Sequence, residues 1–161
     1  MNNLNFQQPS NFTCGSKAFG DLQLMIKAIA IPGINMNPMP YNGRAGAKFQ
    51  VTSDTIEYDA LDIDIYVDEN FVVYKELMSI VKKNINIDTG TFGDFQFDLW
   101  VEGGNNLGNS RIKWEFHGCR IMNVGGMAFD SSDESTERTV SLTLSFDYFE
   151  IVDNVQPTLR V

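Results

Sequence analysis

Residues 56–67 (IEYDALDIDIYV) contain the segment that decides the fold. In its second half, aliphatic residues occupy every second position, and Asp62, Asp64 and Tyr66 stand between them. Successive side chains of a β-strand point to opposite faces, so this spacing predicts a half-buried strand with one apolar face and one carboxylate face. A strand of this kind needs a second layer of structure to cover its apolar face.

A helix is expected directly after this strand, over residues 68–83 (DENFVVYKELMSIVKK). Asp68 or Asn70 can cap its N-terminus, where acidic side chains are favoured. Lys82 and Lys83 suit the C-terminal end, where cations are favoured. The apolar residues that recur at helical spacing are Phe71, Tyr74, Met78 and Val81, and the residues that widen this stripe are Val73, Leu77 and Ile80.

Alternation with a period of two marks further segments of the chain as strands. Together with the strand and the helix above, they give five or more strands and one helix. This content predicts a mainly β fold, a β-sandwich or barrel with one packed α-helix. The further strands are expected within residues 19–31, 95–101, 111–116 and 139–151.

The chain is expected to hold one domain, because a domain typically spans about 100–200 residues. Residues 19–151 form this β domain, and residues 152–161 form a C-terminal tail. Residues 1–18 are polar and rich in amides, which predicts an N-terminal arm with little core of its own. Residues 32–48 are expected to form a long protruding loop, because their prolines block a central strand and their apolar side chains favour docking on a partner.

The charge of the chain is strongly acidic, with 12 Lys+Arg against 21 Asp+Glu and a net charge of −9. Proteins that grip nucleic acid neutralise phosphates with Lys and Arg, so this charge argues against binding through a basic face. The N-terminal segment lacks the basic and apolar regions of a secretory signal. No apolar stretch approaches the about 20 residues of a membrane-spanning helix, so we expect no membrane partner.

Residues suited to catalysis or metal binding are few. His117 lies two positions from Cys119 on a predicted strand, so the two side chains should share a face at about 7 Å, too far apart for a Cys–His catalytic pair. Asp62 and Asp64 are more typical of a solvated stripe than of an acid–base pair. The spacing of His and Cys matches no zinc motif. We therefore expect no enzyme, no cofactor and no metal, and we expect Cys14 and Cys119 to be reduced, partly buried thiols.

The order of these features resembles the tail tube proteins of contractile-tailed bacteriophages and, more distantly, the Hcp-like tubes of related injection systems. Residues 27–33 (KAIAIPG) are similar to the first core strand of that family and its Pro/Gly turn. Residues 54–69 and the helix at 71–83 resemble its long strand and the helix that follows. Residues 140–151 (VSLTLSFDYFEI) resemble its closing strand. Residues 118–127 lack the aromatic–Pro turn that relatives often carry.

The resemblance implies a structural role in hexameric rings, whose subunit sheets join into one continuous inner β-barrel. Stacked rings would form a conduit through which DNA passes without specific binding. The implied partners are sheath, baseplate and tape measure proteins. The implied location is the tail of a virion that assembles in the host cytoplasm. The long loop of the family contacts neighbouring rings, which corresponds here to residues 34–48, with Met36, Met39, Tyr41 and Arg44 as the expected inter-ring and inter-subunit contacts.

An acidic wall repels phosphates, so a conduit for DNA is expected to carry carboxylates on its inner face. The lumen-facing candidates are Asp62, Asp64, Asp98 and Asp147, together with Ser141, Thr143 and Ser145.

Two other interpretations stay open. The first is a baseplate tube initiator or a tail terminator of the same fold. The second is a β-sandwich module that binds a carbohydrate or another small ligand through Trp100, Trp114 and the loop at 102–110.

Overall fold

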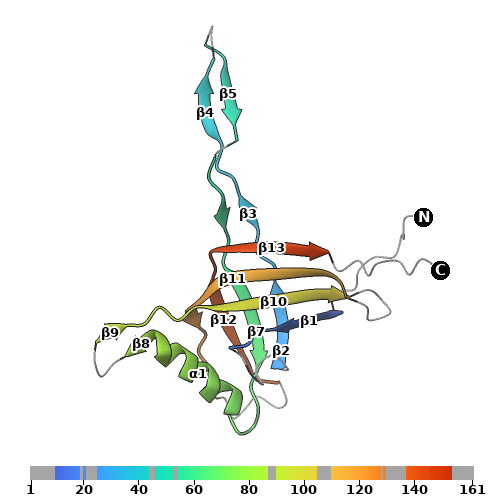
Figure 1. Ribbon diagram of the computed structural model, residues 1–161, viewed down its shortest axis with the longest axis vertical. Helices are drawn as coiled ribbons and strands as arrows, with labels where there is room; N and C mark the ends of the chain where they lie inside the picture. Colours follow the sequence, from blue (N-terminus) through green and yellow to red (C-terminus); the bar gives the residue numbers. More distant parts are fainter. Residues whose placement is uncertain are drawn as a thin grey trace, which may run out of the picture.

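A seven-stranded antiparallel sheet, one helix, a short two-stranded ribbon after the helix and a long projecting hairpin make up the described part of the chain (Figure 1). The structure is a computed structural model. It describes residues 10–18, 20, 25–43, 46–52, 54–86, 90–104, 110–127, 129 and 137–153.

The elements follow one another along the chain in an order that places the only described helix between two groups of strands. They are β1 (Phe12–Gly15), β2 (Ile26–Ala30), β3 (Ile34–Asn35), β4 (Met39–Asn42), β5 (Lys48–Val51), β6 (Glu57–Tyr58), β7 (Leu61–Tyr66), α1 (Val72–Asn84), β8 (Ile85–Asn86), β9 (Thr91–Phe92), β10 (Phe97–Gly104), β11 (Ser110–Val124), β12 (Thr139–Ser145) and β13 (Tyr148–Asp153).

Strand β7 is an interior strand of the sheet, paired with β12 on one side and β2 on the other. Its side chains alternate strictly: Leu61, Ile63 and Ile65 are buried, whereas Asp62 and Asp64 are exposed. The predicted strand and its two faces are confirmed. Burial of each aliphatic side chain contributes about 1.5–3 kcal/mol, so the apolar face fixes the register of β7.

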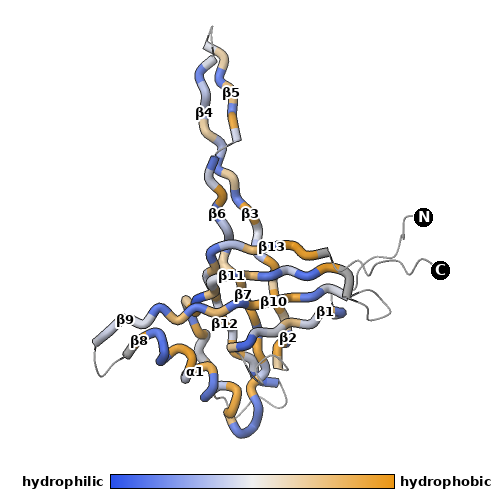
Figure 2. Tube along the Cα trace, in the orientation of Figure 1, coloured by the Kyte–Doolittle hydropathy of each residue, from blue (hydrophilic) through white to orange (hydrophobic). Residues whose placement is uncertain are grey.

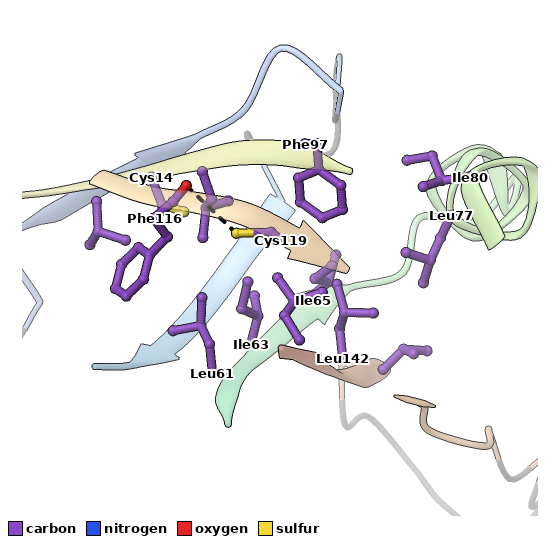
Figure 3. Packing of buried hydrophobic residues seen from close by; sticks show 14 of the residues in the cluster. Cys14, Leu61, Ile63, Ile65, Leu77, Ile80, Phe97, Phe116, Cys119 and Leu142 are labelled. Carbon is purple, nitrogen blue, oxygen red and sulfur yellow. Dashed lines mark hydrogen bonds between the residues drawn. The ribbon is translucent and has the colours of Figure 1, made fainter. Parts of the chain in front are cut away.

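The sheet bends so that its two halves face each other across the core. In Figure 1, β1, β10, β11 and β13 run across the view, whereas β2, β7 and β12 run steeply through it. The helix α1 closes one end of the space between these halves. Figure 3 shows the core with Phe97, Phe116 and Cys119 from β10 and β11, Leu61, Ile63 and Ile65 from β7, and Leu77 and Ile80 from α1.

Strand β11 belongs to both halves of the sheet, and a β-bulge marks the place where it passes from one half to the other. Leu99 pairs with Phe116 and Phe97 pairs with Cys119, so two residues of β11 lie opposite one residue of β10. Gly118 lies in this bulge with φ +66°, a left-handed conformation that favours glycine. Bulges of this kind form the corners between sheet halves that cross at steep angles.

The bulge overturns one prediction about the only histidine. His117 and Cys119 were expected to share a face, but Cys119 is fully buried in the core while His117 is half-buried and contacts Asp98 outside it. The extra residue shifts the alternation of side chains by one position, which two-residue counting cannot anticipate. The conclusion that they form no catalytic pair is unaffected.

The expected closing strand at 139–151 is divided into β12 and β13, which lie end to end along the same edge of β11. Phe146 and Asp147 separate them, opposite the bulge. The backbone N–H of Asp147 donates to the carbonyl of His117 at 2.9 Å. The predicted alternation of side chains is therefore present in β12 and β13, but the bend of β11 interrupts the pairing of this segment with β11.

Part of the predicted N-terminal arm joins the sheet. Strand β1 pairs with β10, and Cys14 and Ser16 are buried. The hydroxyl of Ser16 donates to the carbonyl of Asp98 at 2.6 Å, which ties the arm to the sheet. Residues 1–9 and 154–161, which include most of the predicted C-terminal tail, lie outside the described residues.

The helix begins later than predicted, at Val72, after a left-handed Phe71 with φ 55°. Asp68 still caps it: its carboxylate accepts the backbone N–H groups of Val72 and Val73, each at 3.1 Å. The residues that the helix buries are Val73, Leu77 and Ile80. The sequence predicted these three only as residues that widen the apolar stripe, whereas in the structure they form its centre.

We expect Asp68→Ala to lower the melting temperature at neutral pH. Burial raises the pKa of Asp68, but the N–H groups of Val73 and Val72 outweigh this effect and lower the pKa below its usual value. A folded pKa below the unfolded value of about 3.9 stabilises the protein above that value, and this stabilisation is lost as the pH falls through the folded pKa.

Thermal unfolding followed by circular dichroism at pH 7 and at pH 3 measures this effect. The difference in melting temperature between wild type and Asp68→Ala should shrink at pH 3. Glu69→Ala is the control, because it removes an adjacent charge without removing the cap. An equal difference at both pH values would contradict a role for the ionised carboxylate.

Candidate assembly surfaces

One half of the sheet presents an uncovered polar face on the side opposite the core. Its strands are β2, β7, β12 and the C-terminal part of β11. The register aligns Ala28, Asp64 and Ser141 in one row. A second row aligns Ala30, Asp62, Thr143 and Asn123. We call these seven residues the polar face; all are exposed except Thr143, which is half-buried.

The polar face is small in its side chains and acidic in charge. The hydroxyl of Thr143 donates to the carboxylate of Asp62 at 2.9 Å, which links β12 to β7 on this surface. Ala28 and Ala30 add no bulk beside the two carboxylates. This half of the sheet thus has a smooth outer surface with a carboxylate in each of its two rows.

This half of the sheet ends in an open strand on each side, within the described residues. β2 pairs only with β7. At the other side, residues 120–124 of β11 pair with β12, while the pairing of β11 with β10 stops at Cys119. Open strands present unpaired backbone groups and readily pair with another chain.

The segment after β2 is a long hairpin that projects away from the sheet, with β3–β6 at its base and β4–β5 towards its tip (Figure 1). It was expected to be irregular from 32 to 48, but it forms a two-stranded ribbon that extends to residue 58. Both strands of such a ribbon are edges, which explains why Pro40 is tolerated in β4. Near the tip, the N–H of Gly43 donates to the carbonyl of Ala47 at 2.9 Å, and Gly46 adopts φ +74°.

The two faces of β4–β5 differ in character. Met39 lies opposite Val51 and Tyr41 lies opposite Phe49, so these four side chains share one face. All four are exposed, with 63% exposure for Tyr41 and 58% for Phe49. Figure 2 shows this alternation of hydrophobic and hydrophilic positions along the hairpin. We call these four residues the hairpin stripe; the other face carries Pro40, Asn42, Lys48 and Gln50.

Hydrogen bonds between side chains hold the base of the hairpin. Asn35 donates to the carboxylate of Asp59 at 2.8 Å, and Asn37 donates to that of Glu57 at 3.0 Å. The carbonyl of Gly33 accepts the N–H of Asp59 at 3.1 Å. The hairpin is therefore tied to the end of β7.

A charged cluster surrounds the bulge of β11. The guanidinium of Arg120 donates to Asp147 at 2.7 Å and to Asp94 at 3.0 Å. The hydrogen bond from Arg120 lowers the pKa of Asp94. Asp98 accepts the N–H of Gly118 at 3.3 Å, and its carboxylate lies 3.5 Å from Nδ1 of His117. The cluster joins β11 to its neighbours where the sheet bends.

Comparison with known proteins gives a clear result for structure only. No family model and no curated protein matches the chain. A chain of the extracellular contractile injection system PVC, from its sheath–tube complex in the extended state, matches with a TM-score of 0.68 and 14% identity over 93% of each chain. A chain of the anti-feeding prophage cap (AFP tube terminating cap) matches with a TM-score of 0.64 and 16% identity, over 94% of this chain and 96% of that one. A crystal structure of an Hcp protein matches with a TM-score of 0.50 and 12% identity, over 83% and 72%.

The chain has the Hcp-like tube fold. The tube fold that the resemblance implied is thus confirmed, as is the mainly β content with one helix that the residues predicted. The chain by itself forms an open, bent sheet and not a closed barrel in its described part.

The tube fold separates the predicted lumen residues into two groups. Asp62 and Asp64 lie together on the polar face. Asp98 and Asp147 lie at the bulge with Arg120 and His117. Ser141 and Thr143 belong to the first group.

The predicted hairpin contacts Met36, Met39 and Tyr41 are exposed, whereas Arg44 lies outside the described residues. Sequence reasoning missed the two members of the hairpin stripe that lie on β5, Phe49 and Val51. The short alternation of KFQV over residues 48–51 was the available signal.

The interpretation as a ligand-binding module finds little support in the placement of the two tryptophans. Trp100 pairs with Glu115 while Trp114 pairs with Val101, so the two rings point to opposite faces of the sheet. The ammonium of Lys113 lies over the Trp100 ring at 5.7 Å, and Trp114 packs against the core. They therefore form no common stacking surface. Residues 105–109 of the expected binding loop lie outside the described residues.

The two cysteines are buried and unpaired in the core. Burial raises the pKa of each thiol to about 12, so both are protonated at neutral pH and unreactive. Within the described ranges, no group of three His, Cys, Asp or Glu side chains could hold a metal ion. No helix among the described residues is long and apolar enough to cross a membrane.

Proposed function

We propose that this chain is a structural subunit of a phage tail tube, in which hexameric rings stack into a conduit for DNA ejection. One observation carries the proposal: among the described residues, half of the sheet has an open strand on each side and an uncovered polar face. In an isolated subunit the open strands leave backbone groups unpaired, whereas in a ring they pair with neighbouring subunits.

Ring closure follows from the two open strands. β2 of one subunit pairs with residues 120–124 of β11 in the next, so that the half sheets join into one continuous inner β-barrel. Closing a barrel removes every open edge, which is the most complete protection against unwanted strand pairing. The apolar face of each half sheet stays covered by the core of its own subunit.

The polar face then lines the lumen. Asp62 and Asp64 repeat around the ring and repel phosphates, while Ala28 and Ala30 leave room for DNA to pass. This charge would prevent the DNA from binding to the wall during ejection. For Asp98 and Asp147, the contacts with His117 and Arg120 support a role in holding the bend of the sheet.

The hairpin supplies contacts between rings or subunits, through Met36, Met39, Tyr41 and Arg44. The sheath, the baseplate and the tape measure protein are the further partners of such a tube. A virion tail, assembled in the host cytoplasm, is the corresponding location.

Purified protein is expected to form hexameric rings, and stacks of such rings at high concentration. Negative-stain electron microscopy with class averaging measures both, and analytical ultracentrifugation gives the mass in solution. The closing of strand edges is favourable enough that rings should persist on moderate dilution. A strictly monomeric protein at high concentration, at both low and high salt, would contradict the proposal.

A second candidate function is a tube terminator or a tube initiator of the baseplate. The observation that favours it is the similarity in fold to a chain of the AFP tube terminating cap. The same micrographs separate the candidates, because a tube subunit gives stacks of indefinite length. A terminator or initiator gives single rings that attach to one end of a tube.

A further inference from the structure

The two end strands of the seven-stranded sheet face each other across a groove. Among the described residues, β1 pairs only with β10 and β2 pairs only with β7, so each strand leaves one edge unpaired. The cavity between them has a volume of about 650 Å³ and is lined by residues of both strands. We call this cavity the lateral groove. Its apolar walls include Phe12 from β1, Ile29 from β2, Val101 from β10 and Trp114 from β11.

The lateral groove is open to solvent beside β2. Ile31, which directly follows β2, lines the groove and is 40% exposed. Phe12, Ile29 and Trp114 pack against the core but are only partly buried. In a single subunit this apolar wall stays in contact with water, and its burial by another molecule would be favourable.

The opposite side of the same half of the sheet carries an exposed apolar side chain. Met122 lies on the open end of β11 and is 67% exposed. The register passes from Ile121 opposite Leu144 to Asn123 opposite Thr143, so Met122 is the extra residue of a β-bulge. Of the exposed large apolar residues that the structure describes, only Ile31 and Met122 lie on or directly beside the two open strands of this half.

The residues Ile31 and Met122 lie at the same end of this half of the sheet. Ile31 follows Ala30 and Met122 precedes Asn123, and these two neighbours belong to the row formed by Ala30, Asp62, Thr143 and Asn123. Because β2 and β11 run in opposite directions, both residues lie on the same side of that row. Rotation about the axis of a ring keeps every residue at its own height, so the same ends of neighbouring subunits meet.

We propose that Met122 of one copy fills the lateral groove of the next copy. This rests on the proposed function, because pairing of β2 with the next β11 is what brings the two surfaces together. The thioether packs against Ile31, Phe12 and Trp114: methionine is flexible enough to fit irregular gaps, and its sulfur makes favourable contacts with aromatic rings. Since β1 forms one wall of the groove, the contact joins the inner half sheet of one subunit to both halves of its neighbour.

Loss of either side of the contact should weaken the ring without unfolding the subunit. Met122→Ser removes the entering side chain, and Ile31→Ser removes part of the wall; both residues are exposed, so the subunit should keep its fold. The concentration at which half of the subunits are in rings is expected to rise about tenfold or more for Met122→Ser, the factor that burial of one such side chain supplies. A smaller rise is expected for Ile31→Ser. Val72→Ser is the control, since Val72 is also exposed but lies at the start of α1, away from both open strands.

Mass photometry over a dilution series measures the fraction of subunits in rings. The double variant Met122→Ser with Ile31→Ser should lose little more than Met122→Ser alone, because both changes remove the same contact. Rings of Met122→Ser as stable as those of wild type, or losses that add in full, would overturn the proposal.

A disulfide between copies gives a second readout. In a chain with Ile31→Cys and Met122→Cys, β7 and β12 stand between the two positions. The two cysteines are then three strand spacings apart, roughly 14 Å, too far to pair within one chain. A mild thiol oxidant is expected to give a ladder of covalent oligomers that ends at the hexamer on a denaturing gel. Val72→Cys with Met122→Cys should give no ladder, and Cys14 and Cys119 should not contribute because they are buried.

The two experiments separate the possible failures. Absence of rings in wild type contradicts the proposed function, yet a covalent ladder would still support the contact, and absence of the ladder as well would overturn both. Wild-type rings without the ladder would overturn the contact and leave the proposed function standing. The rings would then close through the strand edges alone, or with another segment of the neighbour in the lateral groove.

Discussion

Replacing Phe116 by alanine is expected to destabilise the subunit by about 3–5 kcal/mol, the range for large aromatic residues in closed cores. Phe116 is 0% exposed, and its ring lies 5.1 Å from that of Phe146 and 5.5 Å from that of Phe149. It lies directly before the two bulge residues, His117 and Gly118, where both halves of the sheet meet. Little in that region can move to refill the space, so most of the cavity should remain.

Urea unfolding of the dilute subunit, followed by tryptophan fluorescence, measures this change. Phe49→Ala is the matched control, because it makes the same chemical change on the exposed hairpin and should shift the free energy of unfolding by at most about 0.5 kcal/mol. Similar losses in both variants would mean that the Phe116 site is not the rigid centre of the core.

The sequence predicts those parts of the fold in which a local pattern and the tertiary packing agree. The alternation in β7 identifies its buried and exposed faces without any knowledge of its neighbours. Asp68 was expected as a cap and does cap the helix, although the helix begins later because Phe71 takes a left-handed conformation. Asp62 and Asp64 lie together for the same reason, since two-residue spacing on one strand needs no long-range information.

The remaining features depend on contacts between distant segments. The sequence around Gly118 does not predict a bulge. The bulge arises because β11 must turn from one half of the sheet to the other. That turn separates His117 from Cys119 and interrupts the closing strand. It also places Asp147 against Arg120 and Asp98 against His117. Prolines in the hairpin led to the prediction of an irregular loop. A two-stranded ribbon tolerates proline as well as a loop does, so proline alone does not distinguish the two.

The hairpin stripe could not be predicted without knowing how β4 pairs with β5. Tyr41 and Phe49 are eight positions apart, and only the register of β4 with β5 places them side by side. Composition can indicate that such apolar residues exist, but the pairing of the strands decides that they share one face.

Reversing the charge of the polar face, the proposed wall of the lumen, is expected to make this face bind DNA. Asp62→Lys with Asp64→Lys changes the charge of each subunit by +4, from −9 to −5, and places every new cation on one face. A cation that contacts a phosphate releases counterions, so affinity should fall steeply with salt, with a slope that grows by about 0.9 per phosphate contacted. Across the proposed ring these contacts would add, and affinity should then rise by orders of magnitude at low salt.

Gel shift and fluorescence anisotropy with a labelled duplex, over a series of salt concentrations, measure this change. Asp54→Lys with Glu150→Lys is the matched control: it makes the same change in total charge at exposed sites outside the polar face. Wild type should not bind, the control should bind weakly, and the polar-face variant should bind far more tightly. Equal binding by the control would mean that net charge alone decides, and the acidic lumen would lose its support. A clear difference would give the net charge of −9 a definite meaning, because the position of two carboxylates, and not the total, would keep the DNA moving.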